Sequence, residues 1–385
     1  MSEKKVIKKS DWVSNFTLVG TPVVNDYTFK IDEKSEKSNW VYNALNLGID
    51  CGEKHGTVYA EMMGGYSEEN ENRIYAHGKK EDGSDDFEKQ IIIAWDDRFN
   101  DEVLEEVGDL SFITVGLTKT DKDKTYYKKF LSAYDAIAYI KEHLTENMVV
   151  NVRGNLKYSE YNDTVQVRKN ITSIALSKAE PSSYKATFTQ SILIDKDSAS
   201  LKNIDKDKGV MFVDARVLDY VKEVKGIEVK GQYPYKKQFE FAMDFSNEGQ
   251  CKRIAEKLFK VKKNVTQVTM EGDFIEGGAV VTASWDDIPD EIKDLVEMGV
   301  FTKEEALAKC TANGNRERRM VMNKPMIKLS GEDKVPVIQK FEDRFTEDDL
   351  YLDYLYNGKR DDKVSFNVGN EESGADTSMD WLKAL

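Results

Sequence analysis

One arrangement occurs twice along this chain and limits its possible folds more than any other feature. A helical pattern is followed directly by a β-strand that carries a glycine. In the first half, AIAYIKEHL (136–144) precedes VVNVRGNL, which contains Gly154. In the second half, CKRIAEKLF (251–259) precedes TQVTMEGDF, which contains Gly272. The repeated order predicts a duplicated α+β unit; chance similarity between two such stretches is the simpler alternative.

Much of the remaining chain consists of short alternating or β-rich runs bounded by turn residues, which is typical of strands. Examples are VSNFTLVGTPVV, WVYNALNLGID, GTVYAEMMGGY, EKQIIIAWDD and LSFITVGLT. This pattern predicts a mainly β fold with a few helices, built as two tandem five-stranded barrels rather than a parallel sheet. The break SKAEPSSYK around Pro181 is the best boundary. We therefore expect domains at 1–180 and 181–330, followed by an acidic C-terminal segment with a flexible tail at 331–385.

Length and composition are those of a soluble protein. The chain has 385 residues, of which 40% are hydrophobic and 33% are charged, enough for two or three domains with cores of their own. No apolar run approaches the roughly 20 residues of a membrane-spanning helix, and no signal peptide is evident at the N-terminus. Three widely spaced cysteines favour a reducing compartment over a disulfide framework. We expect a cytoplasmic protein without a membrane partner.

The net charge of −14 argues against a nucleic-acid partner, but this charge is unevenly distributed. Residues 341–385 contain twelve acidic and five basic side chains, so this segment alone carries −7. Binding depends on the local potential rather than on the sum of charges. An acidic C-terminal segment is therefore compatible with basic stripes on the body of the protein.

Motifs for catalysis or metal binding are scarce. The chain has no phosphate-binding G-x-x-x-x-G-K-[ST] loop, no G-x-G-x-x-G fingerprint and no G-x-S-x-G nucleophile elbow. It contains three histidines. Cys51 and His55 lie four residues apart, but no second pair completes a zinc site. The sequence predicts a protein that is not an enzyme and has neither a cofactor nor a bound metal.

The stretch NVRGNLKYSEYNDTVQVRKN (151–170) combines cations and aromatic rings in one predicted β-hairpin. Side chains two apart in a strand share a face, so Arg153, Asn155 and Lys157 should project together, while Val152, Leu156 and Tyr158 take the other side. Single-stranded nucleic acid binds to such residues, because cations contact phosphates and flat rings stack on bases. An ordinary hairpin with one core face and one charged face is the alternative. The candidate contacts in this ribbon are Arg153, Lys157, Tyr158, Tyr161, Arg168 and Lys169.

A second pair of basic and aromatic clusters accompanies the repeat. TYYKKF (125–130) and YPYKKQF (233–239) both contain the tripeptide YKK. If they occupy equivalent positions, a tandem binder would use them to extend its contact with a polymer. The candidate residues are Tyr126, Tyr127, Lys128 and Lys129 in the first half and Tyr233, Tyr235, Lys236 and Lys237 in the second.

The segment V-N-V-R-G-N-L-K-Y-S-E-Y-N-D resembles the glycine-bearing strand of single-stranded DNA-binding proteins with OB folds. The likeness covers 149–176, with a looser copy at 268–274, and in that family this strand also follows the barrel helix. The resemblance implies a sequence-tolerant protein that coats single-stranded DNA in replication or recombination. The chain is about twice the length of a bacterial subunit, and its C-terminus lacks the bacterial Pro-Phe ending. It is more similar to the divergent versions that bacteriophages encode, which implies the host cytoplasm.

Members of that family recruit replication or recombination proteins through an acidic tail with an apolar tip, and GADTSMDWLKAL (374–385) is similar to this tail. A terminal helix that packs on its own protein is the alternative. Two other functions remain open: a β-rich structural or assembly protein, for example of a virion, and an enzyme without a linear motif. The candidate partner-binding residues are Asp376, Met379, Asp380, Trp381, Leu382 and Leu385.

Overall fold

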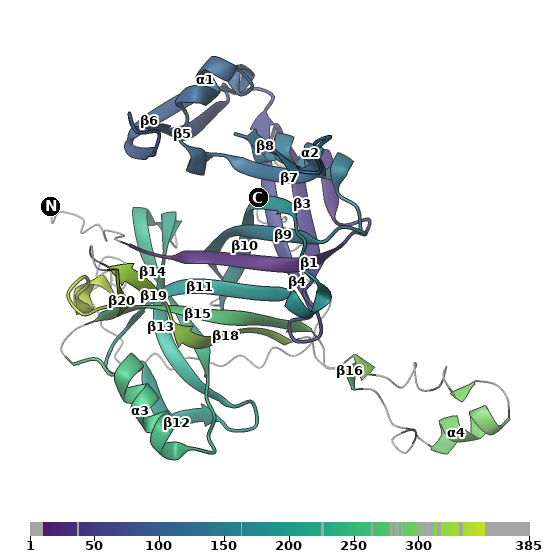
Figure 1. Ribbon diagram of the computed structural model, residues 1–385, viewed down its shortest axis with the longest axis vertical. Coiled ribbons are helices and arrows are strands. Elements are labelled where there is room, and N and C mark those ends of the chain that lie inside the picture. The colour runs from purple at the N-terminus through teal and green to yellow at the C-terminus, as the bar shows by residue number, and fades with distance from the viewer. Residues whose placement is uncertain are drawn as a thin grey trace.

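The computed structural model describes residues 11–350 apart from residues 37, 163, 225–226, 263–264 and 331–333 and several positions between 278 and 316. Strands dominate this part of the chain (Figure 1). The helices in it are short: α1 (Asp101–Glu106), α2 (Ala133–His143), α3 (Glu248–Phe259) and α4 (Asp290–Glu297). None of the described helices is long and apolar enough to cross a membrane.

Five strands of the N-terminal half close a barrel. β1 lies between β3 and β9, β3 pairs with β4, β4 pairs with β10, and β10 returns to β9. The β4–β10 pair is parallel and the other pairs are antiparallel. Helix α2 lies between β4 and β9 in the chain, so strand order and helix position are those of an OB fold. The strands are β1 (Ser14–Val23), β3 (Trp40–Asp50), β4 (Thr57–Ser67), β9 (Val150–Tyr161) and β10 (Thr164–Leu176).

Five strands of the C-terminal half close a second ring in the same order. β11 lies between β13 and β15, β13 pairs with β14, and β14 pairs with β18 in parallel, while β18 returns to β15. Helix α3 occupies the place that α2 has in the first ring. The strands are β11 (Lys185–Ile194), β13 (Val210–Val224), β14 (Ile227–Ala242), β15 (Thr266–Gly277) and β18 (Glu317–Pro325). The mainly β fold with two five-stranded barrels is confirmed.

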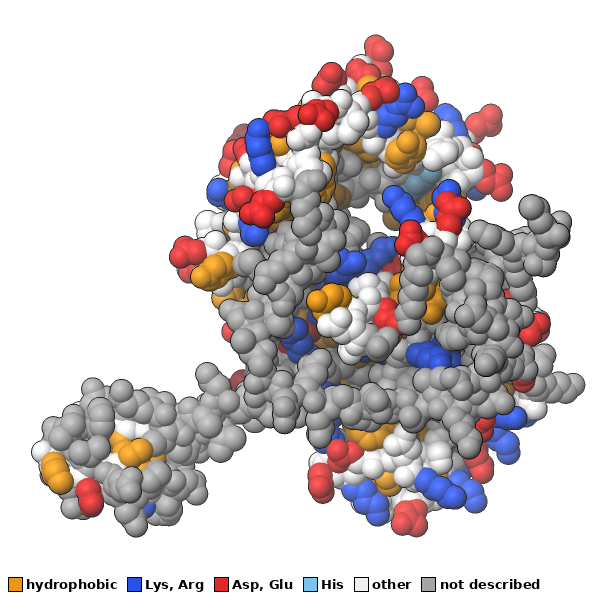
Figure 2. Space-filling view, turned by 180° about the vertical axis from the view of Figure 1, so that it is seen from behind, with side chains coloured by type: hydrophobic (Ala, Val, Ile, Leu, Met, Phe, Trp, Pro, Cys, Tyr) orange, Lys and Arg blue, Asp and Glu red, His pale blue; other side chains and the backbone are white. Residues whose placement is uncertain are grey.

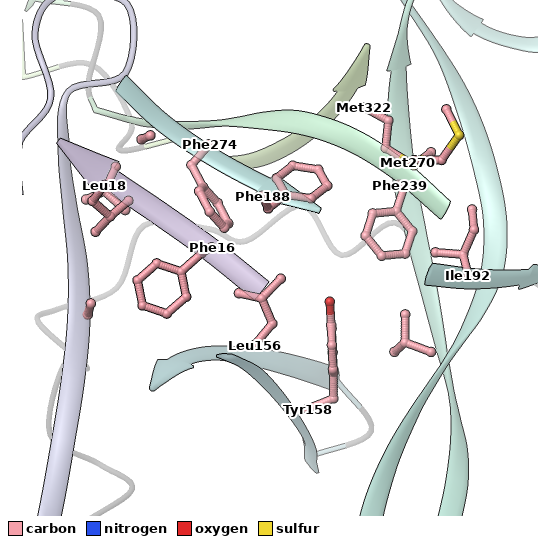
Figure 3. Close-up of a cluster of buried hydrophobic side chains, with 14 of the residues drawn as sticks. Phe16, Leu18, Leu156, Tyr158, Phe188, Ile192, Phe239, Met270, Phe274 and Met322 are labelled. Atoms are coloured by element: carbon pink, nitrogen blue, oxygen red, sulfur yellow. The ribbon is translucent and has the colours of Figure 1, made fainter. Parts of the chain in front are cut away.

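The two rings meet at an antiparallel pair of their first strands, β1 and β11. Phe16 stands opposite Phe188 across this junction, and each phenylalanine faces a glycine of its own ring: Gly154 for Phe16 and Gly272 for Phe188. Both rings contribute to one continuous apolar cluster, in which the two phenylalanines lie (Figure 3). The two glycine strands therefore occupy equivalent places.

Glycine is required at both positions because another backbone lies close by. A Cβ at Gly154 would come within 1.9 Å of the Asn170 carbonyl oxygen, and one at Gly272 within 2.4 Å of the Val321 carbonyl oxygen. A glycine in a strand often marks such close approach. The same local cause thus explains the signature in both halves of the sequence.

Other strands extend these rings. β2 (Phe29–Lys34) pairs with β3, β7 (Ile113–Lys119) pairs in parallel with β10, and β8 (Thr125–Phe130) pairs with β7. β12 (Ala199–Asp205) pairs with β13, and β21 (Lys340–Phe341) with β15. The hairpin β19–β20 (Ile327–Ser330 and Val335–Ile338) and the pair β16–β17 (Val280–Val281 and Ala312–Asn313) form separate small sheets. The 3-10 helices among the described residues are Trp95–Asp97, Asp109–Ser111, Pro181–Ser183 and Glu347–Asp349.

The two YKK segments are not equivalent, so this part of the predicted duplication is wrong. The first lies on β8, which extends the sheet beyond β7, outside the first ring. The second lies on β14, a strand of the second ring. The two segments match only over a short stretch of sequence. Their places in the fold depend on strand pairings between distant segments, which such a stretch does not predict. Pro181 lies in a 3-10 helix between β10 and β11; the domain boundaries stay a prediction.

An insertion between β4 and β7 forms a unit of its own at the top of Figure 1. The hairpin β5–β6 (Arg73–Lys79 and Asp85–Ala94) packs with α1 around a small separate core. The buried residues of this core are Ala76, Ile93, Val107 and Phe112. Its β-rich runs resemble those of the barrels in composition, so the sequence did not distinguish it from them.

Candidate nucleic-acid interface

The β9–β10 hairpin presents one exposed polar face, as the alternation in its sequence predicts. Arg153, Asn155 and Lys157 are exposed along β9, while the alternating residues Val152 and Leu156 are buried. The hairpin joins the fourth and fifth strands of the OB order, and this connection is one of the two loops with which OB folds bind oligonucleotides.

Two cations stand directly opposite each other on this face. Lys157 of β9 is the register partner of Arg168 of β10. Like charges directly opposite in a sheet destabilise it unless counter-charges are near. Asp219 of β13 accepts a hydrogen bond from the Lys157 Nζ at 3.2 Å, and the Glu61 carboxylate of β4 lies 3.8 Å from the Arg168 Nε. Both cations remain partly exposed, so a phosphate could exchange with these carboxylates.

Glu61, the carboxylate nearest Arg168, is largely buried. Burial raises the pKa of its carboxyl, and the opposing attraction of Arg168 and Lys169 only partly offsets this effect. Burial disfavours the charged form of a carboxylic acid. Protonation of Glu61 would therefore leave Arg168 with less compensation and a greater attraction for phosphate.

Two exposed rings lie in or next to loops of the first barrel. Tyr161, at the end of β9, is 52% exposed, and Tyr27, in the connection between β1 and β2, is 69% exposed. On the outer face of β3–β4, the Tyr59 ring lies against Gly48, where a Cβ would come within 3.1 Å of it. Sequence reasoning missed Tyr27 and Tyr59. Once the strand order is known, their places in the first OB loop and on the third strand identify them.

Tyr158 is a core residue, so the prediction that its ring is exposed for stacking is wrong. It is 4% exposed. Its hydroxyl donates to the Gln190 Oε1 at 2.9 Å, and its backbone N–H donates to the Asp219 Oδ2 at 2.8 Å. Burial raises the pKa of its phenol. The ring packs in the apolar cluster between the two barrels (Figure 3). The local sequence does not show this contact between barrels.

Lys169 was predicted to contact phosphate, and this prediction is also wrong. Its side chain is 10% exposed and forms an ion pair with Glu276 of β15. Its Nζ lies 4.7 Å from the centre of the Phe274 ring. Lys169 therefore connects the two barrels and is engaged inside the protein.

Comparison with known proteins places these barrels in a family. A family model described as YorF matches residues 70–271, which is more than half of the chain and spans parts of both rings. The chain belongs to the YorF family.

Two solved structures are similar to this YorF protein, both of the single-stranded DNA-binding protein from Thermus aquaticus. The wild-type structure is 10% identical, with a TM-score of 0.31, and a deletion mutant is 9% identical, with a TM-score of 0.30. Each alignment covers 69% of this chain and 87% of the other. No curated protein matches the chain. The OB strand order of this chain is shown by its own strand pairings.

The first YKK segment of this YorF protein is exposed but is separated from the hairpin. Tyr126 and Tyr127 are exposed on β8, and β7 lies between β8 and β10. The Lys128 Nζ lies 4.8 Å from the centre of the Tyr139 ring, and the Lys129 Nζ is 3.0 Å from the Asp109 carboxylate. The segment can serve as an outlying contact, though the structure does not bring it together with Arg153 and Lys157.

The tyrosines of the second segment are buried, so their predicted stacking role is wrong. Tyr233 and Tyr235 pack edge to face, with ring centres 4.8 Å apart. Burial, and then the negative charges of Asp219 and Glu160, raise the pKa of Tyr235 to about 12. Lys236 and Lys237 are half-buried. In this YorF protein the β13–β14 hairpin thus packs toward the β9–β10 hairpin.

Charge is divided unequally over this YorF chain. Residues 70–112, the insertion, contain thirteen acidic and five basic side chains, a net −8. Together with the −7 of residues 341–385 this gives −15, so the rest of the chain carries +1 to reach the total of −14. Acidic side chains gather over the insertion at the top of Figure 2. The predicted tail contacts at 376–385 lie outside the described residues.

Proposed function

We propose that this protein binds single-stranded DNA with little preference for sequence. The observation that carries the proposal is the β9–β10 hairpin of an OB-ordered barrel. It presents the exposed Arg153 and Lys157, the partly exposed Arg168 and, at the end of β9, the exposed ring of Tyr161. Cations that follow the backbone and rings on which bases stack are the two parts of sequence-tolerant binding. Fold analogy supplies the class of ligand, and the site supplies the residues.

The charge distribution supports the same proposal. Outside the two acidic segments the rest of the chain carries a net +1, so the total of −14 does not describe the surface around the hairpin. Phosphate binding responds to the local potential, which screening limits to about 10 Å at 0.1 M salt. We place the main contact on the first barrel, because the tyrosines of the second barrel's hairpin are buried.

We further propose a setting, which rests on the sequence resemblance alone. The protein would act in DNA replication or recombination of a bacteriophage-like system, in the cytoplasm of the host cell. Its acidic C-terminal residues would recruit a partner protein. The proposed activity is binding and protection of DNA rather than catalysis.

A titration of fluorescent oligo-dT at two salt concentrations tests the function. We expect binding that weakens as salt increases, because each neutralised phosphate releases counterions, about 0.7 per contact for a single strand. Arg153→Ala removes one phosphate contact. It should weaken binding and make the slope of log affinity against log salt concentration smaller by about 0.7. Lys202→Ala removes an exposed lysine from β12 of the second barrel and should leave both unchanged. No measurable binding at low salt would favour a structural or assembly role instead.

A further inference from the structure

The insertion offers an unpaired β-strand edge in strongly acidic surroundings. Among the described strands, β5 and β6 form a sheet of two, so the outer edge of β6 has no neighbour. This edge carries Ile91, Ile92 and Ile93 in sequence. Ile93 is buried in the small core of the insertion, whereas Ile92 is 53% exposed opposite Tyr75, which is 65% exposed. A long apolar edge without a covering element is a template for pairing with another chain.

The ribbon is held in place on both sides. Both ring nitrogens of His77 form hydrogen bonds. Its Nε2 bonds to the Asp85 carboxylate at 2.7 Å, and its Nδ1 bonds to the Ser111 hydroxyl at 2.8 Å. Arg98 pairs with Asp135 of α2 at 2.8 Å, which attaches the insertion to the first barrel. The edge of β6 is therefore presented on a fixed support, and little ordering is needed when a strand adds to it.

The charge of the insertion restricts what can bind. A net −8 over 43 residues, 70–112, repels both DNA and a second acidic copy of this chain. The same charge attracts lysine and arginine. Strand addition supplies main-chain hydrogen bonds, and alternate side chains give specificity.

We infer that the β6 edge docks an extended segment of a partner protein, apolar at alternate positions and basic between them. The apolar side chains pack on Ile92 beside Tyr75, and the basic ones are attracted by the net −8 of the insertion. This site is separate from the β9–β10 hairpin, so it does not rest on DNA binding.

A ten-residue fluorescein-labelled peptide of alternating lysine and valine is the probe, with fluorescence anisotropy as the readout. We expect it to bind the full-length protein, and Ile92→Lys to weaken the binding about tenfold, because an apolar contact is lost and a like charge is added. Leu329→Lys makes the same change at an exposed position of β19 and should have no effect. Ile92 is exposed, so the melting temperature should not change.

Three results would overturn this inference. The first is equal affinity of the peptide for wild type, Ile92→Lys and Leu329→Lys. The second is undiminished binding of a peptide whose amides are all N-methylated, since such a peptide cannot donate main-chain hydrogen bonds to the β6 edge from either of its own edges. The third is a wild-type dimer in sedimentation velocity that Ile92→Lys converts to a monomer, which would make a second copy the occupant. Oligo-dT affinity of Ile92→Lys should equal that of wild type, so failure here is distinguishable from failure of the proposed function.

Discussion

Replacing Tyr158 tests whether this residue stabilises the core or stacks on bases. The ring is 4% exposed and lies in the apolar cluster shared by the two barrels. Truncation of a buried aromatic ring to alanine costs about 3–5 kcal/mol, from lost burial and the cavity left behind. We therefore expect Tyr158→Ala to lower the free energy of unfolding by that amount. At a stability of about 5–15 kcal/mol, this is a large fraction of the total.

Tyr158→Phe is the matched variant. It removes only the hydroxyl that donates to the Gln190 Oε1, and this oxygen keeps a hydrogen bond from the Ser14 hydroxyl at 2.8 Å. Because no buried acceptor is left unpaired, the cost should be about 1 kcal/mol. Urea unfolding followed by circular dichroism measures both variants, and oligo-dT affinity is measured below the transition. Tyr158→Ala within 1 kcal/mol of wild type, but with lost affinity, would refute the core assignment.

Three further predictions concern the barrels. Glu276→Gln leaves the Lys169 ammonium buried without its charged partner and should lower the free energy of unfolding by about 3–5 kcal/mol. The double variant Lys169→Met with Glu276→Leu should recover much of this loss. Additive effects of the two substitutions in urea unfolding would contradict the pairing. Gly154→Ala should destabilise far more than Gly249→Ala in helix α3, where a Cβ meets no atom closer than 3.8 Å; equal melting temperatures would show that β9 can move away from β10. Burial raises the pKa of Glu61, so it protonates early as pH falls and frees Arg168; oligo-dT affinity should therefore rise on acidification in wild type, and Glu61→Gln should bind more tightly at neutral pH with less pH dependence.

The exposed face of the hairpin was predictable because it depends on local periodicity. Side chains alternate across a strand with a period of two, so Arg153, Asn155 and Lys157 had to share a face. The glycine of each repeat was equally predictable, since a neighbouring backbone lies too close to leave room for a side chain there. These features require only the strand itself and its immediate partner.

The same alternation places Tyr158 on the side of Val152 and Leu156. What covers that side was not predictable, because it depends on contacts between distant segments. The backbone of Tyr158 is bonded to Asp219, 61 residues further along the chain, and this contact forms only when the two barrels pack. The same packing buries Tyr235. Conversely, Tyr59 gained importance only from the strand order. Basic and aromatic composition identifies a candidate surface, but tertiary packing decides which rings reach solvent.

Photochemical crosslinking of an iodouracil-substituted oligo-dT, with mass-spectrometric mapping of the adducts, tests the central claim most directly. The account predicts adducts at Tyr161, Tyr59 or Tyr27, around the outer face of the first barrel. These adducts should decrease in Arg153→Ala and should be competed away by unlabelled oligo-dT. Adducts confined to Tyr75 on the acidic insertion, or spread evenly over all exposed tyrosines, would contradict the assignment of the β9–β10 hairpin as the DNA-binding surface.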